Sequence, residues 1–254
     1  MVTKPSRMFR WTRASDTELL AIRFDELRVS LRGTWLERCV MRLHGELTRR
    51  NVRHRPHVWL SEEWFSPTSA PGFAIPFYLT HPRLMRLERT QMRMVDGGTV
   101  PECMAIMRHE TGHAIQTAYR LHTRADWRRT FGNTTTPYPD RYRPDRRSRR
   151  FVRHLPCWYA QSHPDEDFAE TFAVWLGPRA AWRQTYAHWP AALAKLEYVD
   201  ALMREIGNRR PIVASRRTYH RLRDIHRTLG AHYAARRRHY HRPPSFERRG
   251  WLPL

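Results

Sequence analysis

The sequence feature that most constrains the fold is an HExxH motif formed by His109, Glu110 and His113. The segment from Pro101 carries apolar residues at helical spacing, so we expect the motif in the second half of a buried helix. Histidines four residues apart share one helix face and can bind one metal ion. Glu110 projects beside that face, where it can contact a metal-bound water without being a ligand. The motif alone can arise by chance in a chain with fifteen histidines.

A second pattern lies some 50 residues downstream. Pro164 and three acids in the following turn predict the start of a helix. Glu166 and Glu170 are four residues apart and share a face of this otherwise apolar helix. An acid pair on such a helix is costly to bury unless something positive compensates it, and a zinc ion with its imidazoles is such a compensation. The two patterns together predict one site built from two helices.

An HExxH motif followed by a helix with a Glu ligand and a further acid resembles the gluzincin arrangement. More narrowly, residues 166–173, EDFAETFA, are similar to the zinc-binding metallopeptidase family of bacteria and to a helix of the anthrax lethal factor protease. This resemblance covers roughly residues 58–200. It implies that His109, His113 and Glu166 ligate zinc, with Glu110 as the general base. It also implies that Glu170 orients a ligand imidazole.

Tyr159 lies seven residues before Glu166, where the lethal factor pattern has a tyrosine facing the metal. The resemblance therefore implies a catalytic role for Tyr159, and packing in the core is the alternative. An oxyanion formed during hydrolysis needs a hydrogen-bond donor, for which Tyr159, His163 or a tyrosine of the 132–150 loop can serve. The rival third ligands near Glu166 are Asp165, Asp167 and His163. A metzincin site is excluded, because Gln116 and Tyr119 occupy the positions of its glycine and third histidine.

Length and periodicity predict an α+β protein: a mostly helical zincin-like domain with a small sheet, flanked by N-terminal and C-terminal helices. We expect a tail and helical pair over 1–55, the catalytic domain over 56–207, and a basic helix and tail over 208–254. Strands are expected around 58–60 and 73–79, with the proline at 76 restricting the second to an edge. Such an edge can hold extended substrate or be purely structural. The apolar spacing also predicts helices over 15–33, 34–50, 101–119, 164–176, 180–186 and 191–206, and the segment over 81–94 fits either a strand or a helix.

The formal charge of +22 suggests attraction to polyanions. However, Lys4 and Lys195 are the only lysines, so the arginine excess also fits a compositional bias of the genome. Thirteen arginines follow residue 208, and they favour weak non-specific polyanion association through the C-terminus. A nucleic-acid-binding or polyanion-binding protein with a structural or vestigial zinc site is therefore an alternative function.

The three cysteines are far apart in sequence and form no CxxC pair, which favours a reducing compartment. No apolar run approaches the ~20 residues that a membrane span requires. We therefore expect a cytoplasmic protein. The leading hypothesis is a zinc metallopeptidase that acts on a peptide or protein substrate. A zinc hydrolase of non-peptide amides remains open, because its attack chemistry is the same.

Overall fold

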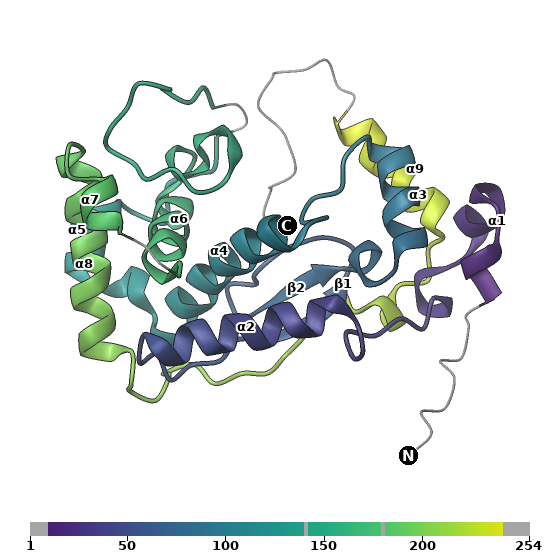
Figure 1. Cartoon of the computed structure of the whole chain (residues 1–254), viewed down its shortest axis with the longest axis horizontal. Coiled ribbons are helices and arrows are strands. Elements are labelled where there is room, and N and C mark those ends of the chain that lie inside the picture. Colours follow the sequence, from purple (N-terminus) through teal and green to yellow (C-terminus); the bar gives the residue numbers. More distant parts are fainter. Residues whose placement is uncertain (1–9, 140–141, 179–180, 241–254) are drawn as a thin grey trace.

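Two buried helices, α4 (Val100–Tyr119) and α6 (Pro164–Leu176), lie in the middle of the molecule and pack most extensively against each other (Figure 1). The computed structural model describes residues 10–139, 142–178 and 181–240. In this part of the chain, helices dominate and one two-stranded sheet is present, which confirms the predicted α+β class. The N-terminal tail before residue 10 and the basic tail after residue 240 lie outside the described residues.

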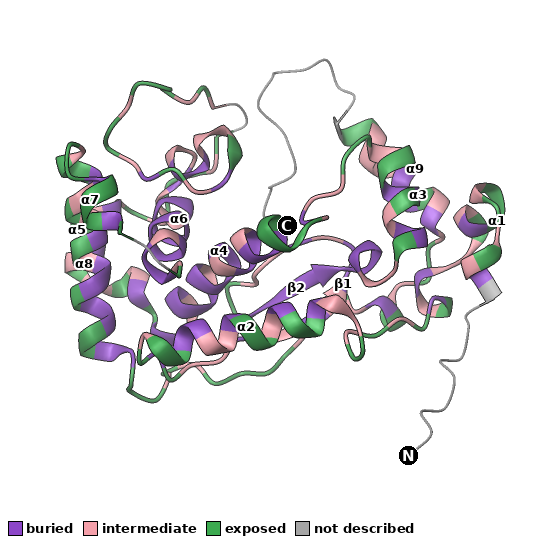
Figure 2. Ribbon diagram, in the orientation of Figure 1, coloured by how far each residue is buried: buried purple, intermediate pink, exposed green. Residues whose placement is uncertain are grey.

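The other elements surround this pair. With η for 3-10 helices, they are η1 (Arg10–Arg13), α1 (Asp16–Ala21), η2 (Phe24–Glu26), α2 (Trp35–Arg49), β1 (His57–Ser61), β2 (Gly72–Pro76), η3 (Phe77–Thr80), α3 (Pro82–Met92), η4 (Leu121–Thr123), α5 (Ala125–Phe131), η5 (Pro156–Gln161), α7 (Trp182–Thr185), α8 (Pro190–Ile206), η6 (Leu222–Asp224) and α9 (Leu229–Tyr240). Helices α5, α7 and α8 group on the side of α6, whereas α1, α3 and α9 group at the opposite end (Figure 1). Figure 2 shows that α4 and α6 are buried over most of their surface, whereas α2 and α8 are exposed on their outer faces.

Local sequence explains where α4 begins and how closely it approaches α6. Thr99 and Glu102 form a capping box at the start of α4, and Pro101 lies in its first turn. Within the HExxH motif, Gly112 faces α6, and a Cβ at this position would lie 2.7 Å from Ala169 Cα. Only glycine allows this backbone contact, which brings the ligand-bearing faces of the two helices together.

Helix α6 begins where the sequence predicts. The His163 side chain caps the helix by accepting a hydrogen bond from the Asp165 N–H, and Pro164 occupies the first turn. Three acids follow in this turn, where the positive end of the helix dipole stabilises them. As a result Glu166 and Glu170 face α4 from consecutive turns.

Strands β1 and β2 pair in parallel, with His57 opposite Gly72 and Ser61 opposite Pro76. The predicted strand over 73–79 is too long, because Pro76 lacks the N–H that would continue the ladder and the chain turns into η3. An isolated antiparallel bridge between Phe65 and Ala74 covers the other edge of β2 at that point. The segment around Phe65, rather than β2 itself, therefore borders the pocket described below.

The N-terminal and C-terminal predictions need correction. The helix expected over 15–33 ends at Ala21, and the basic helix expected within 208–254 begins only at Leu229. Residues 22–25 and 225–229 instead exchange main-chain hydrogen bonds, for example from Leu229 N to Ile22 O over 2.9 Å. This pairing of distant extended segments replaces the helical turns that the apolar spacing predicts. The segment over 81–94, whose sequence fits either a strand or a helix, forms the helix α3.

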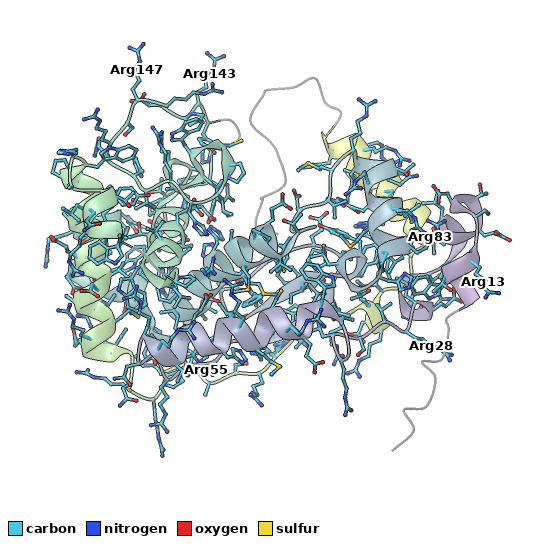
Figure 3. The ribbon with its side chains drawn as sticks, in the orientation of Figure 1. Arg13, Arg28, Arg55, Arg83, Arg143 and Arg147 are labelled. Atoms are coloured by element: carbon cyan, nitrogen blue, oxygen red, sulfur yellow. The ribbon has the colours of Figure 1, made fainter. Side chains whose placement is uncertain are left out.

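Arginines are distributed over the molecule, and some of them are part of the fold. Figure 3 shows Arg143 and Arg147 pointing away from the body of the protein. Arg236, in contrast, is largely buried and forms ion pairs of 2.8 Å with both Glu63 and Glu88, which holds α9 against the rest of the protein. Among the residues with a described structure, no helix is long and apolar enough to cross a membrane.

Candidate metal centre

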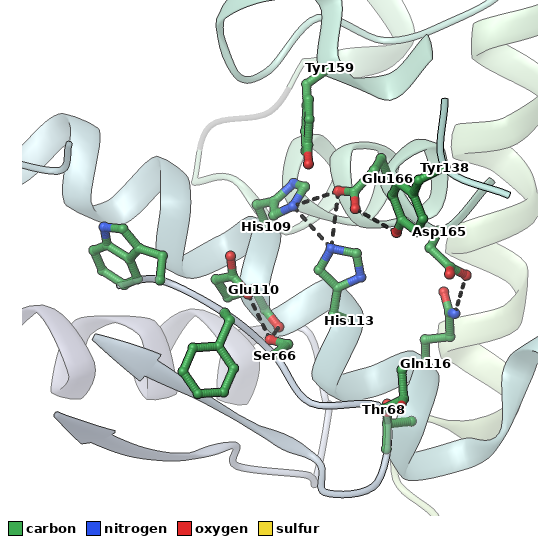
Figure 4. Close-up of a pocket in the computed structure, with 13 residues that line it drawn as sticks. Ser66, Thr68, His109, Glu110, His113, Gln116, Tyr138, Tyr159, Asp165 and Glu166 are labelled. Carbon is green, nitrogen blue, oxygen red and sulfur yellow. Dashed lines mark hydrogen bonds and ion pairs between the residues drawn. The ribbon is translucent and has the colours of Figure 1, made fainter. Parts of the chain in front are cut away.

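The two histidines of the HExxH motif and one glutamate of α6 converge on one point (Figure 4). His109 Nε2 and His113 Nε2 lie 3.1 Å apart. Glu166 Oε2 lies 3.1 Å from His109 Nε2 and 3.2 Å from His113 Nε2. Tetrahedral zinc has bonds of about 2.0–2.1 Å to nitrogen and oxygen, which places its ligand atoms about 3.3–3.4 Å apart. The three donor atoms thus form a triangle of nearly the size that zinc requires.

The protonation of these groups also favours a cation at this point. Glu170 Oε1 lies 2.8 Å from His109 Nδ1, and a carboxylate can only accept, so Nδ1 carries the proton. In the neutral ring, which is the form that binds a metal, His109 Nε2 then directs its lone pair at His113 Nε2 and Glu166 Oε2. Three acceptor atoms that face one another need a positive charge between them. A donor set of two imidazoles and one carboxylate fits zinc in type and number.

The pKa values of the ligand residues follow from the same arrangement. Burial by itself lowers the pKa of His109, but Glu166 and Glu170 outweigh burial and raise it to about 10. Burial raises the pKa of Glu166, but the two histidines outweigh it and hold this pKa far below its usual range. Both carboxylates thus favour a positive charge on His109, and a bound cation would take the place of that proton.

Glu170, the second acid of α6, is completely buried. Its Oε1 accepts from His109 Nδ1, and its Oε2 accepts from the Leu155 main-chain N–H over 2.8 Å. Both carboxylate oxygens are thus fixed by one donor each, and they fix the ring of His109 in turn. The structure brings Glu170 to the imidazole of a candidate ligand, although it lies away from the donor triangle itself.

Glu110 lies beside the donor triangle and lines the same pocket. Ser66 Oγ donates to Glu110 Oε2 over 2.7 Å, and also lies 3.1 Å from the Glu110 main-chain oxygen. Burial raises the pKa of Glu110, and His109, His113 and the Ser66 hydroxyl act in the opposite direction. A carboxylate with a raised pKa is suited to taking up a proton near neutral pH. Sequence reasoning missed Ser66, because nothing in its local sequence marks the contact with a helix 44 residues away.

Two tyrosines border the pocket. Figure 4 shows Tyr159 directing its hydroxyl towards His109 and Glu166, and the centroids of its ring and that of His109 lie 5.7 Å apart. Cys157 and Trp158, which precede it, both adopt left-handed backbone angles, with φ of 64° and 53°. Tyr138 of the 132–150 loop donates from its hydroxyl to Glu166 Oε1 over 2.9 Å. This bond leaves Glu166 Oε2 to the donor triangle.

The three rival ligands are engaged elsewhere. His163 caps α6, and its Nε2 lies 2.7 Å from the Thr136 main-chain oxygen, so it donates to that oxygen. Asp167 forms a 2.5 Å ion pair with Lys195. Asp165 Oδ1 accepts from Gln116 Nε2 over 2.6 Å. Among the described residues, the candidate metal cluster therefore contains Glu166 and none of these three.

The pocket above the triangle has a volume of about 120 Å³. Its lining combines the candidate ligands with aromatic and small polar side chains, which are Trp64, Phe65, Ser66, Thr68, His109, Glu110, His113, Gln116, Thr117, Tyr138, Tyr159, Asp165 and Glu166. The donor triangle is thus open on one side to a space large enough for a small group. The lining comes from α4 and α6, from the segment between β1 and β2, and from Tyr138 of the 132–150 loop and Tyr159 of η5.

Fold and site together define a helical protein with a candidate mononuclear metal site of two histidines and one glutamate. Residues 87–232 match the family model described as "Putative zinc-binding metallo-peptidase". This match covers more than half of the chain, and the protein therefore belongs to that family. No curated protein and no solved structure matches the chain. The donor triangle, Glu110 and Glu170 lie inside the matched region, whereas Ser66 lies before it.

Proposed function

We propose that the protein is a zinc-dependent peptidase, an enzyme that hydrolyses peptide bonds. The observation that carries this proposal is the triangle of donor atoms formed by His109, His113 and Glu166 at the floor of a pocket. Three protein ligands leave one position of a tetrahedral zinc site open, which is typical of catalytic rather than structural zinc. Glu110 beside this open position supplies the base that hydrolysis needs.

In this proposal His109, His113 and Glu166 hold zinc, and Glu170 orients the His109 ring. This division of roles is the one that the resemblance to gluzincins and to the lethal factor protease implies. A histidine ligand whose second nitrogen donates to a carboxylate is a common arrangement in zinc sites, since the bond fixes the ring and raises its basicity. The contact between His109 Nδ1 and Glu170 Oε1 supports this role.

Zinc, when bound, lowers the pKa of water and polarises the carbonyl group of a substrate. Glu110 accepts the proton as water attacks, and it transfers that proton to the leaving amine. Ser66 keeps the carboxylate of Glu110 in one orientation by donating to Oε2. In this proposal the other oxygen of Glu110 performs the proton transfer.

Tyr159 is the donor that we assign to the carbonyl oxygen as negative charge develops on it. Burial raises the pKa of Tyr159 well above its usual value, so its hydroxyl stays protonated and can donate at every physiological pH. Its direction in Figure 4 supports this role. Preorganised donors of this kind contribute about 2.7–4 kcal/mol to the stabilisation of a transition state.

The test measures metal and hydrolysis separately. We expect purified protein to bind one equivalent of zinc, measured by atomic absorption, and to cleave peptides in a mixed library analysed by mass spectrometry. His113→Ala should lose zinc, whereas Glu110→Gln should keep zinc and lose cleavage. The exposed His188 and Glu197 provide matched controls, because His188→Ala and Glu197→Gln make the same chemical changes at residues that do not line the pocket.

The outcomes separate the alternatives. A protein that binds no zinc contradicts the proposal. A protein that binds zinc and cleaves simple acyl amides, but no peptide, would instead be a hydrolase of non-peptide amides. Zinc-dependent cleavage that survives Glu110→Gln would show that the assigned base is wrong.

A further inference from the structure

We propose that Asp165 and Gln116 form a subsite for a positively charged group of the substrate, next to the bond that is cleaved. This inference rests on the proposed peptidase function and names the class of substrate. The cationic group is either a free terminal ammonium or the side chain of lysine or arginine. Neither Asp165 nor Gln116 has a part in holding the metal or in the proton transfer.

The first observation is the charge of the pocket compared with the rest of the chain. The protein carries 46 lysines and arginines against 24 acids. Yet the described residues that line the pocket include three acids, Glu110, Asp165 and Glu166, and no lysine or arginine. A pocket of this kind on so basic a protein selects against anionic groups and attracts cationic ones.

The roles of the three acids differ. Glu166 is balanced by the metal that it ligates, and Glu110 by the proton that it takes up. Asp165 belongs to neither arrangement, and its side chain is 17% exposed at the pocket. One negative charge is therefore left for a substrate to neutralise.

The contacts of Asp165 leave one of its oxygens without a donor. Oδ1 accepts from Gln116 Nε2 over 2.6 Å. Oδ2 lies 3.4 Å from His163 Nδ1, and in the neutral ring that nitrogen accepts from the Asp165 main-chain N–H and cannot also donate. Oδ2 thus remains an acceptor with unused capacity.

Gln116 provides the second, independent observation. Its side-chain amide is oriented by the bond from Nε2 to Asp165, and Oε1 takes no part in that bond. The residue is only 8% exposed, and Oε1 receives no hydrogen bond from any residue that the structure describes. A buried acceptor without a donor is unfavourable, and a bound group that brings N–H donors would relieve it.

The position of Asp165 and Gln116 relative to the donor triangle determines which part of a bound substrate can contact them. Gln116 follows His113 by three residues, so it lies about one helical turn, or 4.5 Å, further along the same face of α4. Figure 4 shows Asp165 and Gln116 together on one side of His113. A carbonyl at the triangle would therefore place a group on the adjacent residue in the part of the pocket that Asp165 and Gln116 line.

The test measures binding of small zinc-chelating probes to the zinc-loaded protein by calorimetry, and thus does not depend on turnover. Norleucine hydroxamate carries only the terminal ammonium, N-acetyl-arginine hydroxamate carries only the cationic side chain, and N-acetyl-norleucine hydroxamate carries neither. N-acetyl-glutamate hydroxamate provides the anionic comparison. We expect at least one cationic probe to bind on the order of tenfold tighter than the neutral probe, as for a half-buried ion pair. The probe that gains affinity identifies which cationic group the subsite binds.

Asp165→Asn keeps the shape of the side chain and the acceptor for Gln116, but removes the charge. It should bring the cationic probes to the affinity of the neutral one, whereas Glu197→Gln should retain the difference. Equal affinities of cationic and neutral probes for the wild-type protein would overturn the proposal, as would a preference that persists in Asp165→Asn. Failure of the peptidase proposal would appear separately, as zinc-loaded protein that prefers cationic probes but cleaves no peptide.

Discussion

Glu170 accepts two hydrogen bonds, and the effect of losing them on stability and zinc affinity can be derived from the structure. Two N–H donors converge on its two oxygens, His109 Nδ1 on Oε1 and Leu155 N on Oε2, each over 2.8 Å. A carboxylate satisfies both donors, because it has acceptors on both sides. In Glu170→Gln, whichever way the amide is turned, its NH2 group opposes one of the two donors.

The expected cost follows from this conflict. A hydrogen bond to a charged group contributes about 1.5–3 kcal/mol, and the variant loses at least one of them in a fully buried place. If the amide turns its NH2 towards Leu155, folding stability falls by this amount. If it turns towards His109, the ring loses its orientation, and zinc affinity falls about 10–100-fold.

The assay is a zinc competition titration against a chromophoric chelator, combined with urea unfolding of the metal-free protein. Glu170→Gln should show the loss in one or both measurements. Glu197→Gln, which removes the same charge on the surface of α8, should show neither. A Glu170→Gln protein with zinc affinity within twofold of wild type and unchanged stability would refute the role assigned to this acid.

Three further changes test the packing and the charges of the fold by urea unfolding. Gly112→Ala inserts a Cβ into the α4–α6 contact and should destabilise the protein by about 1–3 kcal/mol. Gly45→Ala in α2 is the control, because a Cβ there would lie 3.6 Å from its nearest neighbour, Arg49 Nη1, and it should stabilise the protein by up to about 1 kcal/mol. Burial raises the pKa of Asp96 from 3.8 to about 6, so the folded protein retains a proton that the unfolded chain has lost between these values, and wild-type stability falls as pH rises across this window. Asp96→Asn should therefore be more stable than wild type by up to about 3 kcal/mol at pH 7, with the difference disappearing near pH 4, and a pH-independent difference would contradict this. Arg236→Met leaves two acids without their counter-charge and should cost about 3–5 kcal/mol, whereas Arg238→Met on the exposed side of α9 should change stability by less than about 0.5 kcal/mol.

The parts of the site that the sequence predicts are those whose signals are local. Four-residue spacing places two side chains on one helix face, whatever the rest of the chain does. Pro101 and Pro164 likewise mark the beginnings of α4 and α6 through the chemistry of a single turn. The sequence therefore predicts which side chains of each motif share a helix face, without knowledge of the contact between α4 and α6.

The parts that could not be predicted depend on contacts between distant segments. Ser66 reaches Glu110 because Phe65 pairs with Ala74, and no side-chain pattern encodes that bridge. The late start of α9 has the same origin, because main-chain hydrogen bonds with residues 22–25 replace helical turns. Main-chain pairing of this kind leaves little trace in the identity of the residues.

The arginine excess shows a different limit. Composition does not separate arginines that stabilise the fold from those that only add charge, because each of them adds one positive charge to the net charge. The structure distinguishes them by burial: Arg236 is held between two acids, whereas Arg147 extends from the surface. The bidentate contact of Arg108 with Glu46, over 2.8 and 2.9 Å, is a second arginine used to join helices, here α4 and α2.

The spacing of the acids on α6 has a physical reason that only the structure reveals. Glu166 and Glu170 contact the same imidazole from its two nitrogens, the first at Nε2 and the second at Nδ1 of His109. Residues four apart on a helix differ by about 6 Å along its axis, enough to reach both ends of one ring that lies between them. A spacing of two would place the second acid on the opposite side of α6, and a spacing of seven would carry it a further turn beyond the ring. The four-residue interval thus allows both acids to contact one imidazole, just as the interval between His109 and His113 allows both histidines to face one metal ion.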